Sequence, residues 1–554
     1  MNLLLLSLSL LGAQDAGQSS APVLKTSATT IEVTAAGASE HVVYGSQLAG
    51  PSTHQALTTA GNLWTHTDGG AAWIARDVSI GNLGTQVFAE YDLNNEAAEV
   101  LSAFDVDPAT PIWTDVSPLG TEFRNVASAA DVDVHVAANQ TIVGSIQTRE
   151  VTVRKFRSRR ANPDWTYTFT PLINGAGKVA ISDDGSTIVA AIINTNTSSV
   201  EIAVLNPNNG NLLSYTVLPP AGNGLRGFDL SEDGSTLYFS QGVVANLFDI
   251  ATQTIVFSQN IGAGFDSHAI SGDGSVFAFG NFNSMRVWAF DGSTYVNTQT
   301  HTLSGQVYCA QIDISADSST LAYAWYYYNP GLNVRIDAMD VATGAALMTE
   351  TINGQGGFQN LPVDVSMNAD GSRFAVGLWG DAGTVDEVRV YSSSQSAPTQ
   401  TLNLPGSVFD LDMSADGQRV AVGSKSVHAN TNGNGGQVNL LDAGGEDLTM
   451  LGSPRIGTTP SVISSGPISN FALLITSPLP QSPPLFIPGA GTLYVHRQTL
   501  SFMNAGISDN NGTLVTAYPI AADPLLIGTN VYMQAIYLNP RVLTADYLKI
   551  TILP

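Results

Sequence analysis

The sequence is poor in cysteine and in charged residues, and it lacks long apolar segments. Cys309 is the single cysteine in 554 residues, so an intramolecular disulfide and metal sites built on several thiolates are excluded. We expect this side chain to be buried as a small apolar residue. Only 12% of the residues are charged, against about 25% in typical soluble domains. Beyond the N-terminal region no segment is apolar enough to span a bilayer, so no transmembrane segment is predicted.

Basic residues are also scarce. The chain has 21 Lys and Arg against 46 Asp and Glu, a net charge of -25. Because phosphate binding needs an excess of basic side chains, no nucleic acid is expected as a partner. A His-Glu-x-x-His motif and a Gly-x-Ser-x-Gly elbow are both missing, and the eight histidines are scattered without ligand spacing. The sequence therefore predicts no metal site and no cofactor.

What the sequence has instead is a repeat. Each copy consists of an apolar stretch, a Ser-x-Asp-Gly-Ser turn and a second apolar stretch, and Gly suits a tight turn because it accepts positive φ without a Cβ clash. Long segments with helical periodicity are absent, which favours an all-β fold. The copies are ISDDGSTIVAA from Ile181, LSEDGSTLYFS from Leu230, ISGDGSVFAFG from Ile270, ISADSSTLAYA from Ile314, NADGSRFAVG from Asn368 and MSADGQRVAVG from Met413.

The spacing of these turns identifies the architecture. From Asn139 to Asp416 the gaps between equivalent turn positions are 45, 49, 40, 44, 53 and 46 residues, which is the length of a four-stranded propeller blade. A weaker copy begins at Asp77, with its turn near Asn82. We count eight units over residues 71–451 and predict a β-propeller of eight blades, with seven as the alternative.

The two ends of the chain differ from the repeats. The apolar run Leu3–Leu11 is too short to span a membrane and predicts a signal peptide over residues 1–16, hence a secreted, periplasmic or cell-surface protein. Residues 17–70 are rich in Ser, Thr and Ala and are expected to be a linker or an irregular cover over the first blade. Residues 452–554 are dense in Pro, lack the Asp-Gly phrase and predict a separate small β-sandwich that packs on the propeller or attaches the protein to another component. We expect a monomer.

The repeated units resemble the WD40-like and YVTN-type propellers of secreted bacterial proteins. They are also similar to quinoprotein alcohol dehydrogenase-like propellers, whose blades carry an Ala-x-Asp-x-x-Thr-Gly-x-x-x-Trp docking pattern. Ala338, Asp340, Thr343 and Gly344 match this pattern, with Met348 in the Trp place. In the first unit Ala103, Asp105 and Trp113 match, with Pro108 and Ala109 replacing Thr-Gly. The resemblance implies the fold. It leaves the activity open, because those dehydrogenases often hold their cofactor against a vicinal disulfide, which a chain with one cysteine cannot form.

The loops that join the second and third strands of a blade are the long ones in this chain. They include NTNTSS after Ile193, WYYYNPGLN from Trp325, LWGDAGTVDE from Leu378 and SKSVHANTNGNGGQ from Ser424. Insertions gathered on one face of a repeat array are typical of its binding face. The candidate ligand-binding residues there are Trp325, Tyr326, Tyr327, Tyr328, Trp379 and Asp381, with His428 and Asn430 as further polar contacts. The alternative is that alternate aromatic residues pack between blades.

A second candidate site lies at the mouth of the central channel. Arg226, Asp266, His268 and Tyr308 stand at the starts of inner strands, and polar residues there either bind a ligand or hold channel water. The glycines of GNGLRG match a Gly-x-Gly-x-x-Gly motif, but a strand and not a helix is expected to follow, so no dinucleotide site is predicted.

One basic cluster stands out in this acidic chain. RKFRSRR places Arg154, Lys155, Arg157, Arg159 and Arg160 within seven positions. It indicates either a local anion or polysaccharide contact or, more simply, an edge strand protected by charge against aggregation.

Two hypotheses on function follow. The first is an exported, non-catalytic binding or scaffold protein that uses one propeller face for a protein or polysaccharide ligand. The second is a propeller enzyme, either a quinoprotein-like oxidoreductase or a lactonase-like hydrolase, with its site at the channel mouth.

Overall fold

The computed structural model describes most of the chain after residue 60. It describes the strands β1 (Val23–Thr26), β2 (Thr30–Thr34) and β3 (His41–Tyr44), which form one antiparallel sheet, and then residues 61–554. The ranges left out within 61–554 are 68–72, 82–83, 85, 94–98, 106–109, 118–120, 143–148, 170–176, 195, 221–223, 263–266, 330–331, 355–358, 382–384, 432–434, 444–447, 466–470, 488–490, 509–512, 539–540 and 545–546. The signal-peptide prediction and Asp266 lie outside the described residues.

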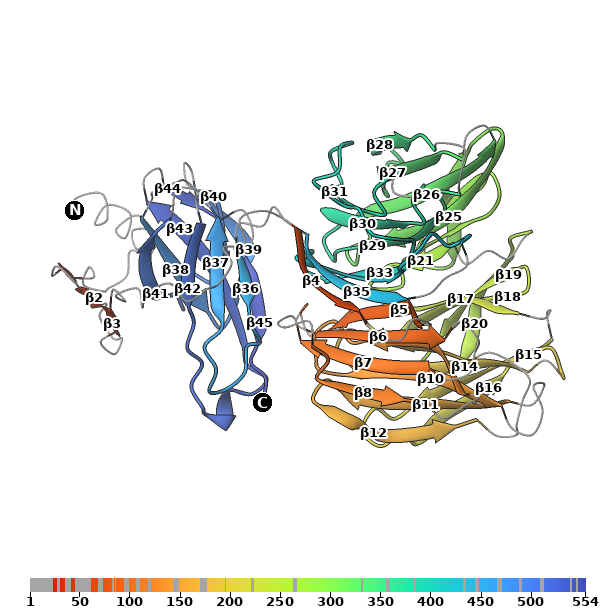
Figure 1. Cartoon of the computed structure of the whole chain (residues 1–554), viewed down its shortest axis with the longest axis horizontal. Coiled ribbons are helices and arrows are strands. Elements are labelled where there is room, and N and C mark those ends of the chain that lie inside the picture. Colours follow the sequence, from red (N-terminus) through yellow and green to blue (C-terminus); the bar gives the residue numbers. More distant parts are fainter. Residues whose placement is uncertain are drawn as a thin grey trace. The chain divides into compact units, whose positions relative to one another are not determined.

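The chain divides into two compact units, Ala60–Gly444 and the combination of Met1–Thr59 with Gly445–Pro554. Both are built of strands (Figure 1). Among the described residues no helix has the length and apolar character needed to cross a membrane.

The larger unit is a β-propeller. Within the described residues it contains eight antiparallel sheets of four strands each, and seven of them consist of four strands consecutive in the chain. We number these sheets in chain order from the one that begins with β5. The first four are β5 (Trp73–Gly81), β6 (Gln86–Leu93), β7 (Glu99–Asp105), β8 (Trp113–Val116); β9 (Thr121–Ser128), β10 (His135–Ile142), β11 (Arg149–Arg157), β12 (Arg160–Thr168); β13 (Gly177–Ile181), β14 (Ile188–Asn194), β15 (Ser199–Leu205), β16 (Leu212–Val217); and β17 (Leu225–Leu230), β18 (Thr236–Gln241), β19 (Val244–Asp249), β20 (Thr254–Asn260).

The remaining sheets continue the same pattern. They are β21 (His268–Ile270), β22 (Val276–Gly280), β23 (Ser284–Phe290), β24 (Tyr295–Thr302); β25 (Gln306–Ile314), β26 (Thr320–Asn329), β27 (Val334–Asp340), β28 (Ala346–Ile352); β29 (Pro362–Met367), β30 (Arg373–Leu378), β31 (Val388–Ser392), β32 (Gln400–Leu402); and, in the last sheet, β33 (Val408–Met413), β34 (Arg419–Lys425), β35 (Gly436–Asp442) and β4 (Gly61–Thr67).

The last sheet closes the ring with a strand from the other end of the chain. β4 pairs antiparallel with β35, with Asn439 opposite Thr65 and Leu440 opposite Trp64. Residues 61–67 therefore form a strand, whereas the sequence analysis placed them in a linker or irregular cover. The reason is physical: a free edge on the last sheet exposes unpaired backbone groups, and the N-terminal strand covers them.

The Ser-x-Asp-Gly phrase forms the turn between the first and second strands. In the third sheet Ser182 Oγ and the Ser186 N–H both donate to Asp184 Oδ1, and Gly185 has a φ of 69°. The carboxylate of Asp184 thus accepts the Ser186 N–H in the turn, in place of a backbone carbonyl oxygen. The pattern recurs at Ser231 and Asp233, Ser271 and Asp273, Ser315 and Asp317, Asn368 and Asp370, and Ser414 and Asp416.

Backbone hydrogen bonds between neighbouring turns hold the sheets together at this end. They run from the second sheet to the eighth: Asp131 N to Asp183 O, Asp183 N to Glu232 O, Asp233 N to Gly272 O, Gly272 N to Ala316 O, Asp317 N to Ala369 O and Ala369 N to Ala415 O, at 2.9 to 3.4 Å.

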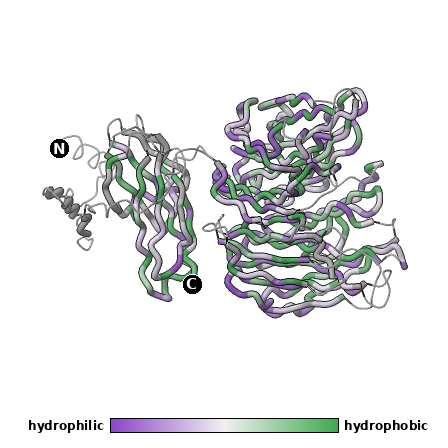
Figure 2. Tube along the Cα trace, viewed as in Figure 1, coloured by the Kyte–Doolittle hydropathy of each residue, from purple (hydrophilic) through white to green (hydrophobic). Residues whose placement is uncertain are grey.

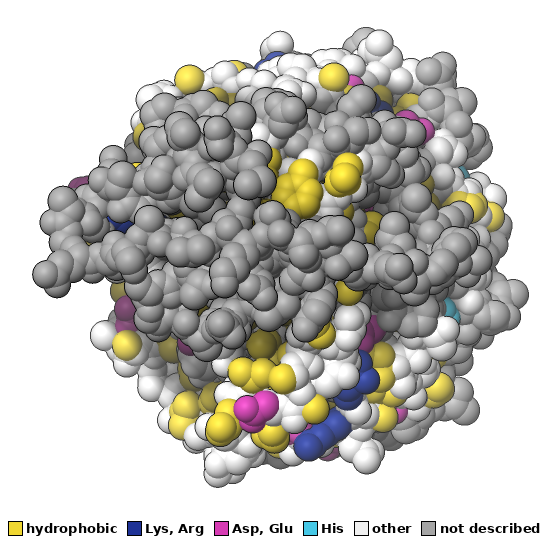
Figure 3. Space-filling view, turned by 90° about the vertical axis from the view of Figure 1, so that its left-hand side faces the viewer, with side chains coloured by type: hydrophobic (Ala, Val, Ile, Leu, Met, Phe, Trp, Pro, Cys, Tyr) yellow, Lys and Arg dark blue, Asp and Glu magenta, His cyan; other side chains and the backbone are white. Residues whose placement is uncertain are grey.

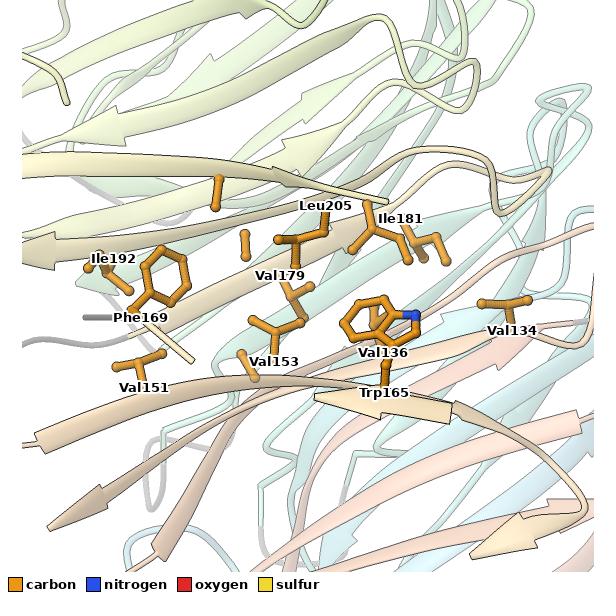
Figure 4. Packing of buried hydrophobic residues seen from close by; sticks show 14 of the residues in the cluster. Val134, Val136, Val151, Val153, Trp165, Phe169, Val179, Ile181, Ile192 and Leu205 are labelled. Carbon is orange, nitrogen blue, oxygen red and sulfur yellow. The ribbon is translucent and has the colours of Figure 1, made fainter. Parts of the chain in front are cut away.

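The core of the propeller lies between adjacent sheets. Between the second and third sheets Val136, Val153 and Trp165 face Val179 and Leu205, as expected for sheets that pack face to face (Figure 4). Along the strands hydrophobic and hydrophilic residues alternate in short stretches (Figure 2). Cys309 is fully buried in the core between the fifth and sixth sheets, as predicted.

Tryptophans also dock one sheet on the next. Trp113 of the first sheet donates from Nε1 to the carbonyl oxygen of Ser158 at 2.8 Å, and Trp165 of the second sheet donates to that of Pro207 at 3.0 Å. A Cβ at Gly210 would lie 2.7 Å from the Trp165 ring. Glycine therefore permits the close approach of the third sheet to this indole.

The smaller unit is a β-sandwich. A three-stranded sheet holds β36 (Leu448–Leu451), β37 (Ser461–Ser465) and β42 (Thr513–Ala517), and a second holds β38 (Phe471–Ser477), β41 (Ser501–Ile507), β43 (Asn530–Leu538), β44 (Arg541–Leu543) and β45 (Leu548–Thr551). Leu448, Val462, Leu474 and Met533 come from both sheets and share one buried cluster. A hairpin of β39 (Pro480–Ile487) and β40 (Gly491–Val495) and the 3-10 turn Pro524–Leu526 complete the unit.

β36 marks a difference from the predicted boundary. The sequence analysis extended the propeller to residue 451, but Leu448–Leu451 belongs to the sandwich. Because β4 already supplies the fourth strand of the last sheet, Leu448–Leu451 pairs with β37 in the second unit instead. Leu525 and Ile507 of the sandwich are well exposed. On the side of the molecule shown in Figure 3, hydrophobic side chains lie in small groups, with a few Lys, Arg, Asp and Glu side chains among them.

Candidate functional site

The topology places the longest connections between propeller strands at one end of the propeller. In a four-stranded antiparallel sheet the turns from first to second and from third to fourth strand share one end, and the remaining connections lie at the other. We call this other end the long-loop face. Over the last three sheets it includes described parts of the connections 353–361, 379–387, 403–407 and 426–435.

His428 ties three of these connections together. Its Nδ1 accepts a hydrogen bond from the Asn430 N–H at 3.1 Å, so the ring proton lies on Nε2. Nε2 is 3.1 Å from the carbonyl oxygens of both Gln359 and Gly380. The Asn430 side-chain amide donates to Gln359 Oε1 at 3.1 Å. One buried imidazole thus fixes the relative positions of segments that are about 70 residues apart in the chain, as in the 71-residue separation of Asn430 and Gln359.

Ser407 adds a second fixed point beside it. Its hydroxyl donates to the Trp379 carbonyl oxygen at 2.7 Å and accepts from the Ala429 N–H at 2.8 Å. A Cβ at Gly406 would lie 2.3 Å from the backbone nitrogen of Val427, so only glycine allows these two connections to touch. The Trp379 and His428 rings meet edge to face at 6.2 Å. The loops therefore form a braced surface.

Three tyrosines gather next to these loops. The rings of Tyr308, Tyr326 and Tyr328 lie 5.1 to 5.5 Å from one another. Tyr326 is buried against the seventh sheet, Tyr308 is half-buried, and Tyr328 is 50% exposed. Burial and the neighbouring Tyr328 and Asp381 raise the pKa of Tyr326 to about 12, so its hydroxyl is protonated at neutral pH. Tyr328 thus presents an aromatic face to solvent over two supporting rings.

The other members of the aromatic run point the opposite way. Trp325 is only 1% exposed and packs with Tyr323 between the fifth and sixth sheets, where Tyr327 also contacts the core. Side chains alternate along a strand, so Tyr326 and Tyr328 face one neighbour while Trp325 and Tyr327 face the other. The structure brings together Tyr308, Tyr326 and Tyr328, with Asp381 close enough to act on the pKa of Tyr326. Trp379 contacts His428 instead, and Trp325 and Tyr327 lie on the other side of the sheet.

Among the described residues, several buried polar atoms on these strands and connections have no hydrogen-bond partner. They are the Tyr326 hydroxyl, both amide atoms of Asn360 and the Trp379 Nε1. The backbone N–H of Trp379 donates to the Leu361 carbonyl oxygen at 2.8 Å, so the two connections that carry Asn360 and Trp379 are bonded to each other. Buried polar groups are normally satisfied by protein or by ordered water. The surface below the long loops therefore has hydrogen-bonding capacity that the protein itself leaves unused.

At the channel mouth the residues predicted from the sequence have different structural roles. His268 stacks on Tyr238 at 4.9 Å, and its Nε2 accepts a hydrogen bond from the Phe228 N–H at 3.1 Å. It thereby joins the fourth and fifth sheets. Arg226 is exposed on β17. The GNGLRG stretch runs into a strand, so the dinucleotide motif has no helix here.

The basic run forms a clamp between the first two sheets. Arg154 bonds Asp115 at 2.8 Å and Arg159 bonds Asp105 at 3.0 Å, and both carboxylates belong to the first sheet. Within the second sheet Asp164 pairs with Arg157 at 3.1 Å and lies 3.6 Å from Arg160. Arg154, Lys155 and Arg157 lie on the third strand β11, and only Arg160 lies on the edge strand β12. The charges are thus paired within the ring.

One cluster was not foreseen from the sequence. His135 contacts the Ser128 hydroxyl through Nδ1 at 2.7 Å and the Ser158 hydroxyl through Nε2 at 2.9 Å, and Ser158 also bonds Asp133 and Gln86. Burial alone would raise the pKa of Asp133, but the hydrogen bonds from His135 and Ser158 outweigh it and lower that pKa. Although it contains Ser, His and Asp, the cluster has the carboxylate on the same side of the imidazole as Ser158, unlike a hydrolase triad. Ser158 and His135 are also fully buried, so this is a structural network.

Within the described part of the chain no group of three or more His, Cys, Asp or Glu side chains is arranged to hold a metal ion. A search of protein-family models and a search of curated proteins each find no match to the chain.

Proposed function

We propose that this protein is an exported, non-catalytic binding or scaffold protein whose propeller docks a protein or glycan on the long-loop face. The observation that carries this proposal is the half-exposed ring of Tyr328, supported by Tyr308 and Tyr326 and set beside loops that His428 braces. A rigid aromatic surface next to fixed polar groups loses little conformational entropy on binding.

The chemistry of the surface suits such a ligand. An exposed aromatic face stacks on a sugar ring or on an apolar side chain of a peptide. The exposed side-chain amide of Asn430 and the half-buried amide of Gln359 offer both donors and acceptors. Hydroxyl-rich sugars and peptide backbones present the complementary groups.

The type of propeller is also part of the proposal. The docking of Trp113 on Ser158 and of Trp165 on Pro207 resembles the inter-blade docking that the quinoprotein-like pattern implies. The tight turn of Asp340, Thr343 and Gly344 supports the same relationship, since Asp340 Oδ1 accepts from the Thr343 N–H and hydroxyl. We place the chain among quinoprotein-like or YVTN-type propellers of exported proteins.

Export and attachment complete the proposed role. The run Leu3–Leu11 supports a cleaved leader, and the β-sandwich is the proposed attachment module. Mass spectrometry of the N-terminus of the exported protein tests the first point, because a chain that still begins at Met1 would contradict it.

The binding proposal is tested with glycan and peptide arrays. The wild-type protein is compared with the double variant Tyr328→Ala, Asn430→Ala and with Phe290→Ala. Phe290 is 48% exposed and lies at the opposite end of the propeller, so it controls for the loss of an exposed aromatic ring. We expect the wild-type protein to bind at least one array ligand. The double variant should bind that ligand at least tenfold more weakly, a loss of about 1.4 kcal/mol, and Phe290→Ala should bind it as the wild type does. Equal binding by all three proteins would contradict the assignment of the face.

The alternative is an oxidoreductase or hydrolase site at the channel mouth. A thermal-shift assay with pyrroloquinoline quinone and calcium discriminates the two, because a ligand selective for the folded protein raises its Tm. If the quinone with calcium raises Tm and no array ligand does, the enzyme alternative would replace the binding proposal.

A further inference from the structure

The joint where the ring closes is held by carboxyl groups. Asp410 of the last sheet accepts a hydrogen bond from the Val78 N–H of the first sheet at 2.7 Å, and Asp412 accepts from the Ile80 N–H at 2.8 Å. These contacts join β33 to β5 across the joint. Residues more than 330 positions apart in the chain are thus bonded through two side chains.

Two further carboxyl groups flank Asp410. Asp77 of the first sheet directly precedes Val78, whose N–H donates to Asp410, and Asp364 of the seventh sheet accepts from the N–H of Leu411, the residue after Asp410, at 3.2 Å. An ionised carboxylate can only accept hydrogen bonds, so two carboxyl groups bond only when one of them carries a proton. We call Asp77, Asp364 and Asp410 the joint carboxyls.

The joint carboxyls are half-buried, and an apolar core lies beside them. The core between the first and last sheets contains Val78, Ile80, Phe104 and Leu440, with Trp64 of β4 packed against it. The Trp64 and Phe104 rings lie 5.3 Å apart. Repulsion between like charges is stronger beside such an apolar core than in water.

We propose that the closing joint is a pH-sensitive latch: Asp410 holds the last sheet against the first while it shares a proton with Asp77 and Asp364, and the joint loosens when that proton leaves. Deprotonation keeps the bond to the Val78 N–H but places three negative charges side by side. Repulsion among these charges then opposes the contact between the last and first sheets that the Asp410–Val78 hydrogen bond makes.

Other charged groups face the joint carboxyls from the neighbouring sheets. Lys178 of the third sheet acts on Asp77 and favours the ionised form there. Asp412 acts on Asp364, and Asp77 and Asp364 act on Asp410, and these acidic neighbours favour the protonated form. Lys178 thus opposes proton retention at Asp77, and the carboxyl groups favour it at Asp364 and Asp410.

The directions of the pKa shifts agree with the proposed latch. Burial raises the pKa of Asp364 to about 7 and that of Asp412 to about 6, and burial with the charges of Asp77 and Asp364 raises the pKa of Asp410 well above its ordinary value. An acid whose pKa is higher in the folded than in the unfolded protein stabilises the fold below the unfolded value of about 4 and loses that effect as pH rises through the folded value. The latch is therefore closed at pH 5 and weakened at pH 8.

The test compares Asp410→Asn with the wild-type full chain at pH 5 and pH 8. Asparagine keeps an acceptor for the Val78 N–H and a donor for the neighbouring carboxylates, but it has no proton to lose. We expect Tm to be about equal for the two proteins at pH 5 and about 3 °C higher for the variant at pH 8. Asp340→Asn is the control, because Asp340 lies in an exposed turn whose hydrogen bonds lower its pKa, and its effect is expected to be the same at both pH values.

Hydrogen–deuterium exchange gives a local readout in the wild-type protein. After correction for the intrinsic pH dependence, peptides that contain β5 should lose protection at pH 8 relative to peptides from β22, on the fifth sheet. If Asp410→Asn does not fold, this measurement and Asp412→Asn carry the test. An equal Tm effect of Asp410→Asn at both pH values, or unchanged protection of β5, would overturn the latch.

Discussion

Gly371 in the turn of the seventh sheet packs directly on Thr320 of the sixth, and a Cβ added to the glycine would lie 2.6 Å from the Thr320 Cβ. The same glycine has a φ of 69°, in the left-handed region. The turn glycine of the repeat therefore has two roles. It permits the turn, and it lets one sheet approach the next.

Gly371→Ala should destabilise the propeller by more than about 1 kcal/mol, because it adds both backbone strain and a steric overlap. Gly262→Ala separates the two causes. Gly262 has a φ of 82° but no atom within 4 Å of an added Cβ, so only strain remains. Denaturant unfolding of both variants measures the difference, and equal losses would show that the contact with Thr320 is unimportant.

Trp64→Ala should weaken the closure of the ring. Trp64 lies on β4, where its ring contacts Phe104, and it is half-buried. Truncation of a large core aromatic costs about 3 to 5 kcal/mol when fully buried, so about 2 kcal/mol is expected here. Val116→Ala on an exposed position of β8 is the control. A Trp64→Ala protein as stable as this control in denaturant unfolding would argue against a closing role for β4.

Asp133→Asn should destabilise the fold at neutral pH and destabilise it less as the pH falls below about 4. The pKa of Asp133 is lowered in the folded protein, so its contribution is present above the unfolded value of about 4 and is lost as pH falls. The loss at pH 7 should be about 1 to 3 kcal/mol, since the Ser158 backbone and hydroxyl then meet a neutral acceptor. Unfolding curves at pH 7 and pH 3 test this, and an equal loss at both would contradict it.

His428→Ala should loosen the long-loop face without unfolding the propeller. The imidazole bonds the backbone of Gln359, Gly380 and Asn430, and its removal leaves those groups to water or unpaired, at a cost of about 1 to 2 kcal/mol. Exchange of peptides that cover 376–381 and 425–431 should accelerate, while β5 peptides stay protected. A uniform change over the whole chain would show that His428 has no special relation to these loops.

The repeats were predictable because their information is local. The Ser-x-Asp-Gly phrase contains both the hydrogen-bond acceptor and the positive-φ residue of its own turn, as Asp184 and Gly185 show. β4 was not predictable in the same way. It lacks the phrase, and its place in the last sheet depends on pairing with β35, far along the chain.

The candidate site was predictable in part for the same reason. The long connections 379–387 and 426–435 are visible in the sequence, but the prediction of a loop from Trp325 was wrong, because Trp325–Tyr328 lie on β26. Strand alternation there puts Tyr326 and Tyr328 on the same side. Which side faces the loops depends on the packing of neighbouring sheets. Likewise, His428 is visible as a loop residue, but its carbonyl partners on Gln359 and Gly380 lie 69 and 48 residues away and carry no side-chain signature.

The most direct test of the proposed binding face is hydrogen–deuterium exchange of the full chain with and without a ligand selected on the arrays. Peptides from 376–381 and 425–431 and the end of β26 should become more protected, and the Ser-x-Asp-Gly turns at the opposite end should not change. Protection confined to those turns, or to the β-sandwich, would contradict the assignment.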